Sequence, residues 1–282
     1  MSPVFLTADL LLVPNISEHA FQIYHIPPSV SSPIRPILSL GLPPLADSMM
    51  VESIDSQGSP SPTQTPKFGK YLPSHLPFLS DPALAIIVFS LAIGENNPGI
   101  VTFPEDFWMV VHRQALLDLV PLGVVRDPNS QAVVMPWDSW GPPVTRWFCD
   151  DDFTAGSSIH PWGQRFVQHV FPYEVTNEGD SDTITMYDFN PCRVREVQLS
   201  KEHILVAREG RLDDFKIDVF SGDVPGSICR KNIFRFDIIG KLPYIRYRSS
   251  NWPEYETVFI DEERMICVQA SPFTSFSTFW AD

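Results

Sequence analysis

The sequence has few cysteines, and their spacing excludes the common cysteine-rich zinc sites. Structural zinc sites take their cysteines in pairs two to four residues apart, whereas the four cysteines here are separated by 43, 37 and 38 residues. Disulfide frameworks are typical of short secreted chains, and this chain has 282 residues. We therefore expect free, buried thiols at all four positions, which are Cys149, Cys192, Cys229 and Cys267.

Long apolar runs are also missing. The most apolar segment, 83–93 (ALAIIVFSLAI), is far shorter than the ~20 residues that a membrane-spanning helix needs. The first residues have no basic region, and Asp9 interrupts their apolar run, so we expect no secretory signal peptide. These observations predict an intracellular soluble protein, cytoplasmic or nuclear, that does not act at a membrane.

Basic residues are scarce. Lys and Arg number 20 against 34 Asp and Glu, so the formal net charge is -14. Duplex DNA and anionic membranes require a basic face, and we therefore expect neither nucleic acid nor membrane as the main partner. The segment 201–250 departs mildly from this trend, with ten basic residues against seven acidic ones.

Recognisable catalytic patterns are absent from the sequence. None of the seven histidines is paired at i, i+2 or i+4, and there is neither a nucleophile elbow nor a glycine-rich phosphate loop. The acidic run at 150–152 lacks the alternating ligand spacing of a calcium loop, and the acidic run at 261–263 fits a hairpin turn. The sequence therefore predicts no enzyme, no metal and no cofactor.

Prolines and aromatic residues, in contrast, are plentiful. The 28 prolines are about twice the usual share and predict many short elements separated by turns. Residues 112–120 have the apolar spacing of one short helix, which Pro121 ends. Apolar or alternating segments predict strands at 5–14, 20–26, 37–45, 83–93, 101–103, 107–111, 183–189, 204–207, 215–220, 233–239, 245–248, 257–261 and 265–269, with two more within 136–170.

These short, evenly spaced strands predict an all-β fold. Strands that end in IYHIPP, MYDFNP and IDVFSGD resemble the third strand and turn of a WD-type blade, and the cysteines recur at roughly the length of one blade, about 40 residues. We therefore expect a partial or open β-propeller-like (WD-like) arrangement of antiparallel meanders with one short helix. An incomplete propeller leaves sheet edges unpaired, which predicts either self-association through an open edge near the N-terminus or a distorted open arc.

One segment interrupts the strand pattern. Residues 46–80 include the low-complexity run GSPSPTQTP, which has too few apolar residues to order itself. The sequence thus divides into a first meander at 1–45, a disordered Ser/Pro-rich insertion at 46–80, the remaining β-rich domain at 81–270, and a tail at 271–282. Each of Ser59, Ser61 and Thr65 precedes a proline, so the insertion is either a target of proline-directed phosphorylation or an unmodified loop.

The stretch 136–170 holds four of the seven tryptophans. It is either an aromatic platform for a ligand or a set of core residues in which Trp140 caps a Trp-Gly-Pro turn. Arg146 and Arg165 lie among these aromatic residues. They either contact a partner, together with Trp140, or form internal ion pairs with Asp138 or with the acidic run at 150–152.

Several segments together resemble one family. DLLLVPN, IYHIPP, LGLPPL, PWDSWGPPVTRWF, GQRFV, YDFNP, LPYI and FIDEERMI occur here in the order that is typical of fungal F-box-type proteins. In that family an N-terminal F-box precedes a WD-like β-rich region, and this chain resembles the second part without the F-box. The resemblance implies the C-terminal half of such a protein, which does not bind the adaptor of a cullin ubiquitin ligase.

Two functions follow as expectations. The first is a non-catalytic protein-interaction scaffold that resembles the substrate-receptor region of F-box proteins and binds a protein partner. The alternative is a carbohydrate-binding or carbohydrate-acting propeller that uses the tryptophan-rich stretch. Exposed tryptophans beside clustered carboxylates favour the carbohydrate protein, whereas buried tryptophans and dispersed acids favour the scaffold.

Overall fold

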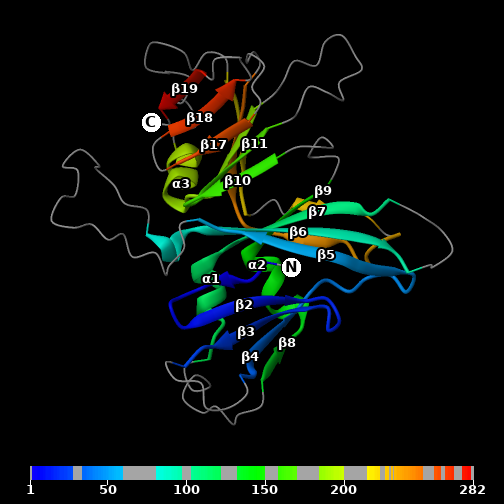
Figure 1. Cartoon of the computed structure of the whole chain (residues 1–282). Helices are drawn as coiled ribbons and strands as arrows, with labels where there is room; N and C mark the ends of the chain where they lie inside the picture. Colours follow the sequence, from blue (N-terminus) through cyan, green and yellow to red (C-terminus); the bar gives the residue numbers. More distant parts are fainter. Residues whose placement is uncertain are drawn as a thin grey trace. The chain divides into compact units, whose positions relative to one another are not determined.

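Antiparallel β-sheets make up most of the structure, a computed structural model, and a few short helices connect them (Figure 1). The expected β class is therefore confirmed. The structure describes residues 2–27, 34–59, 81–96, 103–121, 132–149, 158–169, 184–199, 215–222, 226–228, 230, 232–249, 257–261, 264–269 and 275–280.

The chain divides into two compact units that it visits in turn. Unit 1 comprises Met1–Asp152 and Pro225–Leu242, and unit 2 comprises Phe153–Val224 and Pro243–Asp282. The chain therefore leaves unit 1, builds part of unit 2, returns to unit 1 for one short segment and then completes unit 2. This division differs from the sequence expectation of a single β-rich domain at 81–270.

Unit 1 contains two large sheets. The five-stranded sheet has the order β1 (Val4–Phe5), β2 (Leu10–Asn15), β3 (Ala20–His25), β4 (Pro36–Gly41) and β8 (Val133–Met135), and β4 and β8 run parallel. The four-stranded antiparallel sheet has the order β5 (Met49–Gln57), β6 (Ile86–Glu95), β7 (Glu105–His112) and β9 (Thr145–Cys149). The remaining elements are β14 (Gly226–Ile228), β15 (Ile238–Gly240), the 3-10 helix η1 (Pro82–Leu84), α1 (Arg113–Asp118) and α2 (Trp137–Val144).

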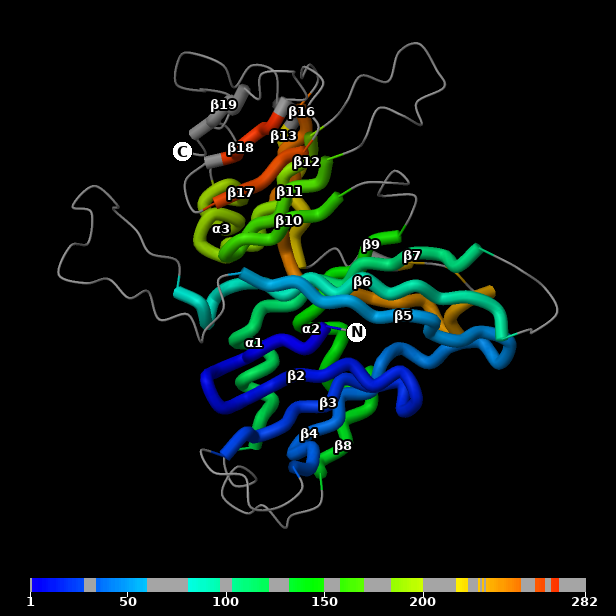
Figure 2. The backbone as a smooth tube through the Cα atoms, in the orientation of Figure 1, coloured from blue at the N-terminus to red at the C-terminus, as the bar shows by residue number. Residues whose placement is uncertain are grey.

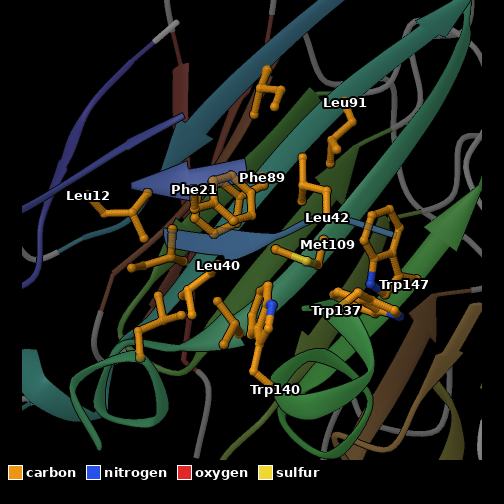
Figure 3. Packing of buried hydrophobic residues seen from close by; sticks show 14 of the residues in the cluster. Leu12, Phe21, Leu40, Leu42, Phe89, Leu91, Met109, Trp137, Trp140 and Trp147 are labelled. Atoms are coloured by element: carbon orange, nitrogen blue, oxygen red, sulfur yellow. The ribbon is translucent and has the colours of Figure 1, made fainter. Parts of the chain in front are cut away.

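The two large sheets of unit 1 share one apolar core. The rings of Phe21 on β3 and Phe89 on β6 have centroids 4.3 Å apart and join the two sheets directly (Figure 3). Helix α2 contacts β4 of one sheet and β9 of the other, and its Trp140 ring packs edge-on against Phe21. Strand β6 is buried along most of its length, as its continuous apolar run predicts.

Unit 2 also contains two sheets. The five-stranded antiparallel sheet has the order β10 (Ser158–Trp162), β11 (Arg165–His169), β12 (Ile184–Asp188), β16 (Tyr244–Ser249) and β13 (Phe215–Phe220), and Figure 2 shows these strands side by side. The three-stranded sheet has the order β17 (Thr257–Ile260), β18 (Arg264–Gln269) and β19 (Ser275–Trp280). The helix α3 (Pro191–Leu199) contacts β13 and β16.

The two faces of the five-stranded sheet in unit 2 carry different side chains because residues alternate along each strand. One face packs its apolar side chains against the three-stranded sheet, and this cluster consists of Val167, Ile184, Val258, Ile260, Met265 and Cys267. The other face carries a row of aromatic rings that runs across β11, β12, β16 and β13. Neighbouring rings in this row, such as Phe166 and Tyr187, stack at 4.4 Å.

Two predicted turns and the predicted number of helices need correction. The sequence predicts one short helix, and α1 confirms it, but the described residues also form α2 and α3. Helix α2 replaces the expected Trp-Gly-Pro turn. Helix α3 replaces the turn expected at Asn190-Pro191, where the Asn190 side chain accepts a hydrogen bond from the Cys192 amide at 2.9 Å. Asparagine at the N-cap and proline at the first helical position are typical of a helix start.

Several predicted boundaries also differ from the structure. Met49–Gln57 forms β5, so the disordered insertion expected at 46–80 is wrong for these residues; positions 60–80 lie outside the described part. Ser275–Trp280 pairs with β18 as a strand, although the sequence suggests an unpatterned tail there. The strand expected at 233–239 is shorter and begins at Ile238.

Candidate functional site

Trp140, one of the predicted contact residues, lies in the core of unit 1. Its side chain is 1% exposed, and its indole Nε1 donates a hydrogen bond to the Gly41 carbonyl oxygen at 2.9 Å. Trp137 contacts both Trp140 and Trp147 edge-on, at 5.2 and 5.7 Å between ring centroids (Figure 3). Because the three tryptophans are buried, the interpretation of this cluster as a ligand platform is wrong for them.

Arg146 is also buried in unit 1. Its Nη1 donates to the carbonyl oxygen of Gly240 on β15 at 3.0 Å. Strand β15 approaches β9 so closely that a Cβ at position 240 would lie 2.7 Å from the Thr145 carbonyl oxygen. The prediction of Arg146 as an accessible partner contact is therefore wrong, because its guanidinium ties β9 to the returning segment of the chain.

Arg165 forms an internal ion pair, as one of the two sequence interpretations predicts, but its acidic partner is a different residue. Its Nε lies 3.0 Å from Asp188 Oδ2, and neither Asp138 nor the run at 150–152 is the acid in this bond. Asp188 is 1% exposed, and its second oxygen accepts a hydrogen bond from the Asn190 amide at 2.8 Å. The Asp188 carboxylate therefore links the β11–β12 pair to the start of α3, and Arg165 has a structural role in this link.

The structure describes only some of the predicted phosphorylation sites and cysteines. Ser59 lies in a half-buried bend, whereas Ser61, Thr65 and Cys229 lie outside the described residues. Of the described cysteines, Cys192 and Cys267 have free thiols. Burial is confirmed for Cys149 and Cys267, but Cys192 is exposed on α3, so the prediction that it is buried is wrong.

The structure brings together a polar cluster that the sequence did not reveal. It lies in unit 2 on β13 and β16, and we call it the β13–β16 cluster; its residues are Asp218, Phe220, Tyr244, Arg246 and Arg248. The antiparallel register places Asp218 opposite Arg246, with Arg248 two residues further along the same face of β16. Strand alternation therefore directs all of these side chains to one face of the sheet.

One carboxylate oxygen holds both arginines of the cluster. Arg246 donates to Asp218 Oδ2 from Nε at 3.2 Å and from Nη2 at 3.0 Å, and Arg248 donates to the same oxygen from Nη2 at 2.8 Å. The three side chains are between 22 and 38% exposed. Two cations and one anion leave one surplus positive charge at a half-exposed position.

The protonation of Asp218 follows from these contacts. Partial burial by itself would raise the pKa of the carboxyl group, but the hydrogen bonds and positive charges of Arg246 and Arg248 lower it below its ordinary value of 3.8. The aspartate is therefore ionised at neutral pH, and both arginine side chains keep their orientation through charge-assisted hydrogen bonds.

Aromatic rings support the cluster from the same face. Phe220 stacks on Tyr244 with the ring centroids 4.4 Å apart and the planes 7° from parallel. The guanidinium carbon of Arg246 lies 4.9 Å from the Phe220 ring centroid, which is within range of a cation–π interaction. Asp218 and Phe220 thus both contact Arg246, and Arg248 is the more exposed of the two arginines.

The sequence carried only weak signals for this cluster. The segments 215–220 and 244–249 alternate in polarity, and the surrounding segment has a mild basic excess. Asp218 and Arg246 are nevertheless 28 residues apart in sequence, and strand pairing over such a distance leaves no local pattern. Only the register of β13 against β16 brings them together.

Other site types find no support in the part of the chain that the structure describes. No group of three His, Cys, Asp or Glu side chains among those residues could hold a metal ion. No described helix is both long and apolar enough to cross a membrane. Comparisons with protein-family models, curated proteins and solved structures found no match to this chain.

Proposed function

We propose that this protein is a non-catalytic interaction scaffold whose β13–β16 cluster binds a carboxylate-bearing segment of a partner protein. The observation that carries the proposal is the pair of half-exposed arginines that share Asp218 Oδ2. A guanidinium presents several N–H donors in a planar fork that matches a carboxylate. The surplus positive charge of the cluster suits a second carboxylate that arrives from outside.

The chemistry of the cluster favours binding over catalysis. A general acid or base works best with a pKa near the operating pH, whereas the pKa of Asp218 is lowered and the carboxylate is engaged by two arginines. The rigid aromatic support under Arg246 reduces the conformational entropy that binding would cost. Arginine and aromatic residues are also the types enriched at protein interfaces.

The position of the tryptophans supports the scaffold over the carbohydrate-binding alternative. A sugar platform needs exposed aromatic faces, and Trp137, Trp140 and Trp147 lie in the core of unit 1. These three tryptophans therefore contribute to stability, and we assign the binding role to unit 2.

The propeller-like arrangement and the likeness to the WD-like region of fungal F-box-type proteins belong to the same proposal. The four-stranded antiparallel sheet β5-β6-β7-β9 has the size of one propeller blade. The five-stranded sheets are larger, and one of them includes the parallel pair β4 and β8. A substrate-receptor role would agree with a surface that recognises an acidic segment.

Quantitative affinity purification tests this function. The wild-type chain is compared with Arg248→Gln and with the control Arg235→Gln, since Arg235 is an exposed arginine of unit 1 that also pairs with one aspartate, Asp47. We expect at least one protein that the wild type and the control retain and that Arg248→Gln loses. Recovery of the same proteins by all three chains contradicts the assignment of the site, and recovery of none contradicts the scaffold function.

A further inference from the structure

Strand β13 is an edge strand of the five-stranded sheet in unit 2. One side of β13 pairs with β16 over all six residues, Phe215–Phe220, and no described strand pairs with its other side. The side chains of Ile217 and Val219 are 36 and 40% exposed. Unpaired edges with exposed apolar side chains are templates for the addition of another strand.

The other edges of the large sheets in the described part of the chain have features that oppose strand addition. Edge strands β1 and β8 have only two and three residues, and β5 contains a bulge between Val51 and Ser53. Strand β10 contains Pro161, which lacks the N–H that a new strand would need. Strand β9 contacts β14 and β15. Strand β13, in contrast, has six residues, no proline and an unbroken register with β16, and it contacts α3.

The sequence of β13, FKIDVF, is complementary to itself in one antiparallel register. If Ile217 of one copy lies opposite Ile217 of a second, then Lys216 lies opposite Asp218 and Phe215 lies opposite Val219. Apolar residues then face apolar residues, and each charge faces the opposite charge, which stabilises cross-strand pairs. Asp218 already accepts hydrogen bonds from Arg246 and Arg248 of its own chain, so the match of apolar positions 215, 217 and 219 is what favours a second copy of the same chain at this edge.

We propose that two copies of this protein pair through β13 in this register, about a two-fold axis at Ile217. The interface is isologous, because each copy uses the same strand, and the two five-stranded sheets become one continuous sheet. The two-fold axis is perpendicular to the sheet, so both β13–β16 clusters lie on the same face. The pairing is independent of the proposed function, because it needs the purified chain alone.

Analytical ultracentrifugation of the purified chain over a concentration series gives the first test. We expect a concentration-dependent species of twice the monomer mass of 31.9 kDa, and Ile217→Lys should abolish it. The control is Ile239→Lys, because Ile239 on β15 is 39% exposed and should not affect pairing. A wild-type chain that stays monomeric overturns the proposal, and so does a dimer that Ile217→Lys leaves intact.

Disulfide cross-linking tests the register. Two Ile217→Cys chains would bring their Cα atoms to about 4.5–5.5 Å across the two-fold axis, which suits a disulfide. In the same dimer, Val219 of one copy would lie roughly 14 Å from Val219 of the other, too far for a disulfide. In a background with Cys192→Ser and Cys229→Ser, we expect Ile217→Cys to cross-link and Val219→Cys not to. Equal cross-linking of the two variants, or none in either, overturns the proposed register.

Discussion

Substitution of Trp140 tests whether the tryptophan-rich stretch is a core element. The side chain is 1% exposed, and its ring contacts Phe21 and Trp137. Truncation of a buried tryptophan to alanine typically costs about 3–5 kcal/mol, through lost burial and the cavity that remains. We therefore expect Trp140→Ala to lower the free energy of unfolding by this amount.

The matched variant Trp140→Phe isolates the polar contact. Phenylalanine keeps much of the apolar surface but cannot donate the 2.9 Å hydrogen bond to the Gly41 carbonyl oxygen. A carbonyl that loses its donor in a buried position costs about 1–3 kcal/mol. The expected order of stability is therefore wild type, then Trp140→Phe, then Trp140→Ala.

Equilibrium urea denaturation followed by far-UV circular dichroism measures both variants. Hydrogen exchange of peptides from 132–149 shows whether the change lies in unit 1. Surface substitutions usually change stability by less than about 0.5 kcal/mol. A loss of that size for Trp140→Ala would refute the assignment of this tryptophan to the core and would restore the platform interpretation.

Three further predictions concern packing, thiol chemistry and pH. A Cβ at Gly141 would overlap the Trp137 ring, so Gly141→Ala should destabilise unit 1 by about 1–3 kcal/mol in urea denaturation; unchanged stability would contradict the packing. Burial raises the pKa of the Cys267 thiol to about 12, so iodoacetamide at pH 8 should label the exposed Cys192 and spare Cys267, as peptide mass spectrometry can verify. Because the pKa of Asp218 is lowered in the folded state, its contribution to stability is present above pH 3.8 and is lost as the pH falls through the lowered pKa. Asp218→Asn should therefore reduce stability at neutral pH and converge with wild type in acid; a constant difference would count against the arginine contacts.

The sequence predicts those strands and helices that are determined by patterns over a few neighbouring residues. The continuous apolar run at 83–93 predicts a strand buried on both faces, and β6 confirms it. The apolar spacing at 112–120 predicts a helix, and α1 lies within that range. These predictions succeed because periodicity and composition act over only a few residues.

Helix α2 shows where local rules fail. Residues 137–144 include Gly141, Pro142 and Pro143, which are poor helix formers by intrinsic propensity, and the sequence therefore favoured a turn and a strand. Burial of Trp137 and Trp140 against both sheets supplies the stabilisation that propensity lacks. For α3, in contrast, the sequence contains a helix start signal, Asn190-Pro191, but the same pair is also typical of a turn.

The candidate site was beyond sequence prediction for a topological reason. The segment of unit 1 at Pro225–Leu242 interrupts unit 2, so β13 and β16 are neighbours in the sheet but not in sequence. Their register decides which charges meet, and a shift by one residue would place the arginines on the other face. The sequence therefore favours Arg146 and Arg165 as contact residues, whereas in the structure Arg146 bonds to the Gly240 carbonyl oxygen and Arg165 pairs with Asp188.

The most direct test of the binding role is an affinity measurement with the full chain. An acidic peptide from the protein captured by affinity purification is titrated calorimetrically into the wild type, Arg248→Gln and Arg235→Gln. Hydrogen bonds to charged groups contribute about 1.5–3 kcal/mol, so Arg248→Gln should weaken binding by about tenfold or more, while Arg235→Gln should match the wild type. Equal affinity of all three chains would contradict the role of the β13–β16 cluster.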